Sequence, residues 1–73
     1  MHNYELLIEY INPCGGEKHA VKEFLEVDAA SPEAYVAENG QYPVLNVGAT
    51  PDGDTIITTG DGKGRMIRYT FTE

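Results

Sequence analysis

The sequence has few of the residues on which several kinds of chemistry depend. Its 73 residues include no tryptophan, one cysteine, one serine, two histidines and five lysines or arginines. A single cysteine excludes an internal disulfide, and the single serine, Ser31, is placed to cap a helix and not to serve a Ser–His–Asp triad. So few cations do not form the basic face that displaces counterions from a phosphate backbone. Direct binding to DNA or RNA is therefore not expected.

Long apolar runs are also absent. The chain opens Met-His-Asn-Tyr-Glu, with no basic segment followed by an unbroken apolar stretch, so neither a signal peptide nor a membrane span is predicted. One unpaired cysteine is typical of a reducing compartment. We therefore expect a cytoplasmic protein without a membrane partner.

The composition that remains is typical of one small globular domain. Hydrophobic residues make up 41% and charged residues 23% of the chain, close to ordinary usage. A chain of this length buries only about 60% of the surface that its unfolded form exposes. We expect a single domain over residues 1–73, for which association into a homodimer is the simplest additional source of stability.

The first segment, residues 4–11, predicts a strand, because aromatic and branched residues alternate along it with the residues between them. The sequence Asn-Pro-Cys-Gly-Gly at 12–16 then predicts a turn, since proline lacks the backbone donor and paired glycines favour tight turns. A second strand that pairs with the first is the simplest continuation.

Residues 17–28 fit two patterns, an amphipathic helix and a strand. We favour the strand, because an antiparallel register in which paired positions sum to 31 sets Leu6 opposite Leu25 and produces consistent partners along both segments. The same register sets Glu5 opposite Glu26, which is unfavourable. A helix here would leave the first strand in need of a partner from the C-terminal region.

The best-defined element is a short helix over residues 32–39. Ser31 is suited to cap its free N–H groups, and Pro32 and Glu33 suit its first turn. Gly40 is predicted to end it in the left-handed conformation. Two turns of helix are unstable alone in water, so this helix must pack on other elements.

The C-terminal part predicts three strands that form a meander, over residues 44–49, 55–59 and 65–72. A turn at 50–53 joins the first two strands and a glycine-rich loop at 60–64 joins the last two. Pairing positions that sum to 124 sets Ile57 opposite Ile67. The predicted fold is thus α+β: a small two-layer β-β-α-β-β-β arrangement, with an antiparallel sheet and one short helix on one face.

The charge distribution favours a small acidic protein-interaction or regulatory module. The net charge is −7, and seven carboxylates but no lysine or arginine lie from Glu23 to Asp54. An acidic face steers basic partners, and an open sheet edge pairs with a partner strand or with a second copy. Tyrosines often anchor interfaces. The candidate interaction residues are Glu23, Glu26, Asp28, Glu33, Glu38, Tyr35, Tyr42, Lys63 and Arg65.

Two alternatives remain open. The carboxylates could imitate nucleic acid and inhibit a DNA-binding protein, although twelve are few for that role. The chain could also be a small enzyme or ligand binder that uses Cys14 as a reactive thiol in an exposed turn and His19 as its base. No residue is evident that would orient His19, and His2 is too distant in the predicted hairpin to complete a metal site. Catalysis, a metal and a cofactor are therefore not expected.

Overall fold

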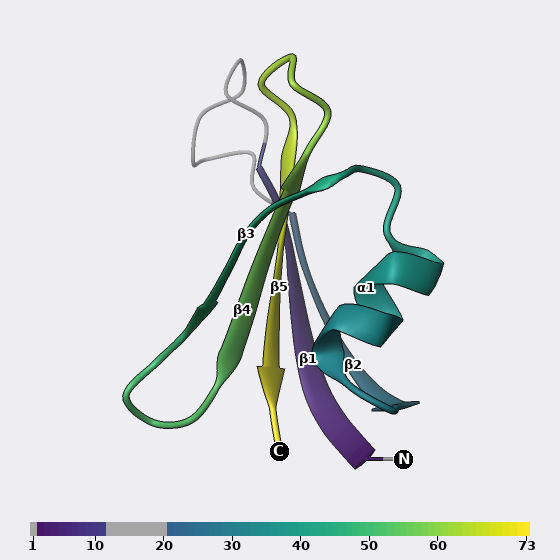
Figure 1. Ribbon diagram of the computed structural model, residues 1–73, viewed down its shortest axis with the longest axis vertical. Coiled ribbons are helices and arrows are strands. Elements are labelled where there is room, and N and C mark those ends of the chain that lie inside the picture. Colours follow the sequence, from purple (N-terminus) through teal and green to yellow (C-terminus); the bar gives the residue numbers. More distant parts are fainter. Residues whose placement is uncertain (1, 12–20) are drawn as a thin grey trace.

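The structure, a computed structural model, describes residues 2–11 and 21–73. Its elements are β1 (His2–Ile11), β2 (Val21–Ala29), α1 (Pro32–Asn39), β3 (Val44–Ala49), β4 (Thr55–Gly60) and β5 (Met66–Thr72) (Figure 1). The strands form one antiparallel sheet in the order β2-β1-β5-β4-β3. The predicted α+β class, an antiparallel sheet with one short helix, is confirmed.

The N-terminal hairpin has the predicted register. Leu6 pairs with Leu25, and Glu5 pairs with Glu26. The strand prediction is thereby confirmed over Val21–Ala29, and the helical alternative is wrong there. A strand is favoured because alternate residues of β1 face the core, and β2 adds further apolar side chains to the same face. The turn predicted at 12–16 lies outside the described residues.

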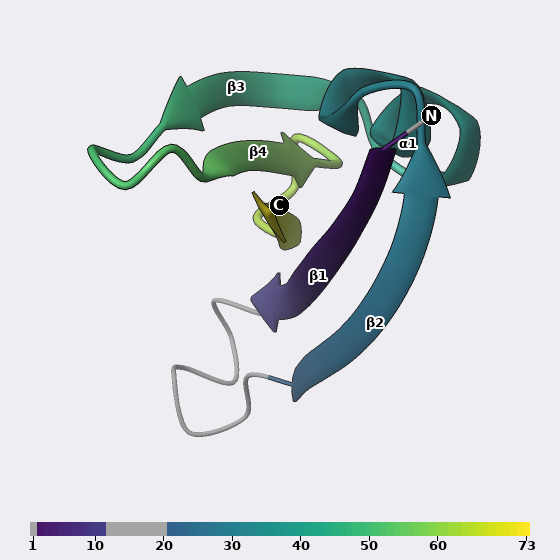
Figure 2. The ribbon, with the colours of Figure 1, turned by 90° about the horizontal axis from the view of Figure 1, so that it is seen from below.

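The core lies between α1 and one face of the sheet. Figure 2 shows the helix beside the sheet near the N-terminal end of β1, and α1 contacts both β2 and β4. Val36 is the buried residue of the helix. The tyrosine rings of Tyr4 and Tyr35 meet the ring of Phe71 edge-on, with centroids 5.6 and 5.8 Å away. The buried apolar residues are Tyr4, Leu6, Ile8, Ala29, Val36, Ile57, Ile67, Tyr69 and Phe71.

The start of the helix is as predicted, but the glycine at its end acts differently. The Ala34 N–H donates to Oγ of Ser31 at 3.1 Å, which satisfies one free donor of the first turn. The left-handed conformation predicted for Gly40 is wrong, since its φ of −73° and ψ of 142° are extended. A Cβ atom there would lie 2.6 Å from the carbonyl oxygen of Val36. Glycine is needed for this close approach and not for its backbone angles.

The register predicted for the last hairpin is wrong by two residues. Ile57 pairs with Tyr69 and not with Ile67, so paired positions sum to 126. The loop explains the shift: Oδ1 of Asp61 accepts the N–H groups of Lys63 at 2.7 Å and of Arg65 at 3.2 Å. Asp61 is thereby held opposite Arg65. Because the shift is an even number of residues, the same side chains still face the core.

The turn between β3 and β4 agrees with the sequence. The Gly53 N–H donates to the Thr50 carbonyl oxygen at 3.0 Å, and Gly53 has a φ of 94°. This left-handed conformation is accessible to glycine without a steric penalty. The turn places β3 at the outer edge of the sheet.

Candidate functional site

The two edge strands of the sheet, β2 and β3, differ in charge. β2 contains Lys22, Glu23, Glu26 and Asp28, whereas β3, with the sequence Val-Leu-Asn-Val-Gly-Ala, contains no charged residue. In β3 the side chains of Val44, Leu45 and Val47 are 49%, 57% and 49% exposed. Natural edge strands commonly carry charges that discourage pairing with other chains. β3 is therefore the less protected edge.

The backbone of β3 directs hydrogen-bonding groups away from the sheet. The Thr50 N–H donates to the Asp54 carbonyl oxygen at 2.9 Å, just beyond the end of the strand. Successive residues of an antiparallel strand direct their backbone groups to alternate sides. The N–H and C=O groups of Val47 and Ala49 therefore point away from β4. The register shifts at the start of β3, so the regular edge is its C-terminal half.

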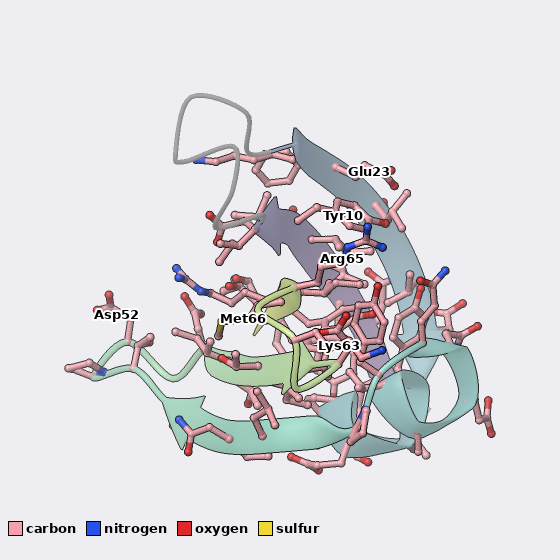
Figure 3. The ribbon with its side chains drawn as sticks, turned by 90° about the horizontal axis from the view of Figure 1, so that it is seen from above. Tyr10, Glu23, Asp52, Lys63, Arg65 and Met66 are labelled. Atoms are coloured by element: carbon pink, nitrogen blue, oxygen red, sulfur yellow. The ribbon has the colours of Figure 1, made fainter. Side chains whose placement is uncertain are left out.

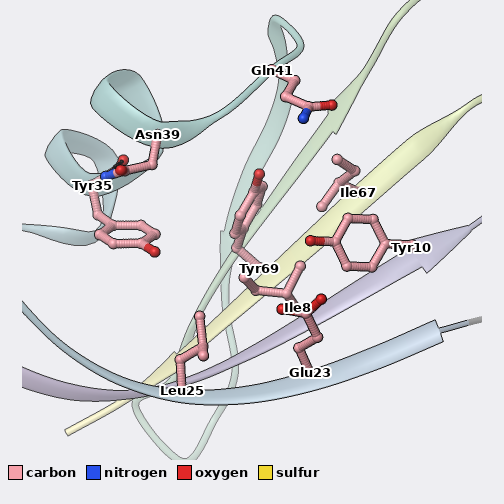
Figure 4. Close-up of a pocket in the computed structure, with 9 residues that line it drawn as sticks. All are labelled: Ile8, Tyr10, Glu23, Leu25, Tyr35, Asn39, Gln41, Ile67 and Tyr69. Atoms are coloured by element: carbon pink, nitrogen blue, oxygen red, sulfur yellow. Dashed lines mark hydrogen bonds between the residues drawn. The ribbon is translucent and has the colours of Figure 1, made fainter.

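A pocket of about 210 Å³ lies between α1 and the sheet (Figure 4). It is lined by three aliphatic side chains, Ile8, Leu25 and Ile67, by three tyrosines, Tyr10, Tyr35 and Tyr69, and by three other polar residues, Glu23, Asn39 and Gln41. In Figure 4 the hydroxyl groups of Tyr10 and Tyr35 point toward Tyr69 from opposite sides. A concavity that combines apolar side chains with convergent polar groups is a candidate ligand site.

Oxygen atoms dominate the polar groups of this pocket. Asn39 Nδ2 donates to the Tyr35 carbonyl oxygen at 3.0 Å, so the amide oxygen of Asn39 is left as an acceptor. The pKa of Tyr69 is raised, first because burial disfavours the phenolate and then because the ionised phenols of Tyr10 and Tyr35 would repel it. At neutral pH the Tyr69 hydroxyl is therefore protonated.

Among the described residues, 2–11 and 21–73, Glu23 is the only charged residue that lines the pocket. Among residues 2–11 and 21–73, the salt bridges join Glu9 to Lys22 at 3.9 Å and Glu9 to Arg68 at 3.7 Å, and neither involves Glu23. The pocket consequently presents one negative charge beside neutral oxygen acceptors.

The predicted acidic residues are distributed over several surfaces. Glu26, three residues after Glu23 on β2, faces the opposite side of the sheet, and Asp28 accepts a hydrogen bond from Asn3 Nδ2 at 3.1 Å. Glu33 lies in the first turn of α1, and Glu38 is exposed later in the same helix. Of these carboxylates, the structure brings only Glu23 into the pocket of Figure 4, whereas Asp28 and Glu38 line a smaller pocket of about 160 Å³ against α1 together with Tyr35.

The other predicted interaction residues lie in three places. Tyr35 lines the pocket, while Tyr42 is half-buried against the core. Lys63 and Arg65 are exposed in the β4–β5 loop, which Figure 3 shows well away from Asp52 in the β3–β4 turn. The predicted residues therefore do not form one site.

Cys14 and His19 lie outside the described residues, so the reactive-thiol hypothesis stays a prediction. In the part of the chain that the structure describes, no three His, Cys, Asp or Glu side chains are grouped as metal ligands. No helix in that part has the length and apolar character needed to cross a bilayer. Comparisons with protein-family models, curated proteins and solved structures found no match.

The pocket was not predicted from the sequence pattern. Asn39 and Gln41 come over the sheet only because α1 packs across it, and no periodicity in the sequence signals that position. The positions of Tyr10 and Tyr69 in the strand pattern are as typical of core residues as of residues that line a pocket. The sequence did contain an indication of the β3 edge, since the segment from 43 to 50 contains no charged residue.

Proposed function

We propose that this protein is a protein-interaction module in which β3 pairs with an extended segment of another polypeptide. One observation carries the proposal: β3 is an edge strand with no charged residue and three exposed large apolar side chains. Addition of a partner strand gains main-chain hydrogen bonds, and alternate side chains supply specificity. The edge of β2 is less suited, because its charges oppose such pairing.

A partner of different sequence is favoured over a second copy of this chain. Each copy carries a net charge of −7, so two copies repel one another, whereas a neutral or basic segment experiences no repulsion or an attraction. The outward groups of Val47 and Ala49 offer the partner two residues of regular pairing. Val47 also offers an apolar contact on the face of the sheet that carries α1.

The proposal is tested by selecting short peptides from a random displayed library against the full chain and measuring their binding to Val47→Pro. Proline removes the outward N–H of Val47 and leaves the β3–β4 hydrogen bonds in place, because that N–H does not take part in them. We expect the dissociation constant of selected peptides, measured by fluorescence anisotropy, to rise by about tenfold or more.

Val47→Thr is the matched control, since it keeps the N–H group and a β-branched shape. Selected peptides should bind this variant with a dissociation constant within about threefold of that of the wild type. Equal binding to the proline and threonine variants would contradict the proposal. So would a selection that enriches no peptide dependent on β3, or sedimentation that shows a dimer closed through β3.

A further inference from the structure

The pocket between α1 and the sheet does not belong to the β3 edge. It is lined by residues of β1, β2, β5, α1 and the segment that follows α1. Of the residues that the structure describes, no lysine or arginine lines it, and Glu23, an acid, does. The electrostatic character of the pocket therefore favours a cation over an anion or a neutral molecule.

The polar groups of the pocket suit a cation that donates several hydrogen bonds. Glu23 offers two carboxylate oxygens, and Asn39 offers its amide oxygen, since its nitrogen donates to the Tyr35 carbonyl oxygen at 3.0 Å. The phenol oxygens of Tyr10 and Tyr35, which point into the pocket in Figure 4, are further acceptors. A quaternary ammonium group has no N–H and therefore cannot donate a hydrogen bond to any of these acceptors.

The apolar and aromatic surface of the pocket favours a guanidinium over an ammonium. Ile8, Leu25 and Ile67 are apolar, and the tyrosine rings add flat π surfaces. A guanidinium is planar, is more weakly hydrated than an ammonium, stacks on aromatic rings and pairs with a carboxylate through two parallel hydrogen bonds. An ammonium is compact and strongly hydrated, so its transfer onto this apolar surface is less favourable.

The size of the pocket sets the size of its ligand. At about 210 Å³ it lies below the range of pockets that enclose drug-sized molecules, which is about 300 to 1,000 Å³. It has room for a single small group. We propose that this pocket binds a guanidinium group, with Glu23 as its carboxylate partner and the tyrosines around its faces and edges.

Two sources could supply this group, an arginine side chain of a polypeptide and a free guanidino compound. The test titrates the full ¹⁵N-labelled chain, at constant ionic strength, with ethylguanidinium, N-acetyl-arginine-methylamide, N-acetyl-lysine-methylamide and tetramethylammonium. We expect saturable shifts of the Tyr35, Asn39 and Gln41 amides with the two guanidinium probes. Tighter binding of the arginine derivative assigns the site to a polypeptide, and equal or tighter binding of ethylguanidinium assigns it to a free compound.

Glu23→Gln should raise the dissociation constant of the guanidinium probes by about threefold to fivefold, because it removes a charged hydrogen-bond acceptor that is exposed to solvent. Glu26→Gln is the matched control: it removes the same charge from the same strand but on the opposite face of the sheet. It should change the dissociation constant by less than about twofold.

Three results would overturn the proposal: equal weakening by the two variants, shifts that do not saturate, or tetramethylammonium binding as tightly as ethylguanidinium. The amide spectra of the variants establish that each is folded. Because the site lies apart from β3, Val47→Pro should leave guanidinium binding unchanged, so this proposal and the one for β3 succeed or fail separately.

Discussion

Gly40 is needed because the fold leaves no room for a side chain there, and not because of its backbone conformation. Its backbone angles are accessible to any residue, but an added Cβ would lie 2.6 Å from the Val36 carbonyl oxygen and 3.2 Å from Val36 Cγ1. The first of these atoms is backbone and accepts the Gly40 N–H at 2.7 Å. The end of α1 therefore has to move if any side chain is introduced.

Gly40→Ala is expected to lower the free energy of unfolding by about 1 to 3 kcal/mol, the usual cost of overpacking. This exceeds the gain of about 0.4 to 1 kcal/mol that a glycine-to-alanine change provides by restricting the unfolded chain. Urea denaturation followed by circular dichroism measures the difference. Gly48→Ala is the control, because nothing lies within 4 Å of its added Cβ, and it should be neutral or stabilising. Equal losses in the two variants would show that the contact with Val36 does not matter.

At the scale of elements, the β1–β2 pair contains a local conflict that its apolar pairs outweigh. Leu6 and Leu25 pair on the core face, while Glu5 and Glu26 pair on the opposite face as like charges. Fully burying an aliphatic side chain such as that of Leu6 is worth about 1.5 to 3 kcal/mol, and Leu25, which is 40% exposed, adds part of this value. An exposed pair of like charges costs only a fraction of that. The hydrophobic pairs therefore decide the register.

Glu26→Lys is expected to raise the free energy of unfolding by about 0.2 to 1 kcal/mol, because it turns a repulsive cross-strand pair into an attractive one. Urea denaturation at low salt measures the gain, which should shrink as salt screens the pair. The same substitution in a Glu5→Gln background is the control for net charge. If the gain is as large in that background, the pair with Glu5 is not its cause.

At the scale of the whole molecule, the fold raises the pKa of two tyrosine hydroxyls. The pKa of Tyr69 is raised by burial and then by Tyr10 and Tyr35. The pKa of Tyr4 is raised by burial and then by the carboxylates of Glu73 and Glu33. These neighbours come from distant parts of the chain, so both shifts require the assembled fold.

We expect stability to fall as the pH rises above about 10. The unfolded phenols lose their protons near the ordinary value of 10.0 while the folded ones retain them, so above that pH the unfolded state binds fewer protons and the free energy of unfolding decreases. Below it, the phenols contribute no pH dependence. Urea midpoints between about pH 8 and pH 11 measure the slope. Tyr69→Phe and Tyr4→Phe should each make it shallower, and an unchanged slope in both variants would contradict the assignment.

The sequence was most informative where a few neighbouring residues decide a structure. Ser31 and Pro32 define the start of α1, and the alternation along residues 4–11 predicts β1, because capping and strand periodicity are local. The register of the last hairpin was predicted wrongly because the side chain of Asp61 selects the loop geometry. For the site, Glu23 and Tyr35 were among the predicted interaction residues, but their partners in the pocket were not.

The sequence by itself determined the types of element, their approximate bounds, the N-terminal register and the excess of negative charge. The tertiary structure decided that β5 pairs with β1, that β3 is an edge strand of the sheet, and that α1 lies where its C-terminal end completes a pocket with Glu23. The physical reason is the range of the interactions. Propensity and capping act within a few residues, whereas strand order and helix position depend on how apolar faces far apart in the chain are buried together.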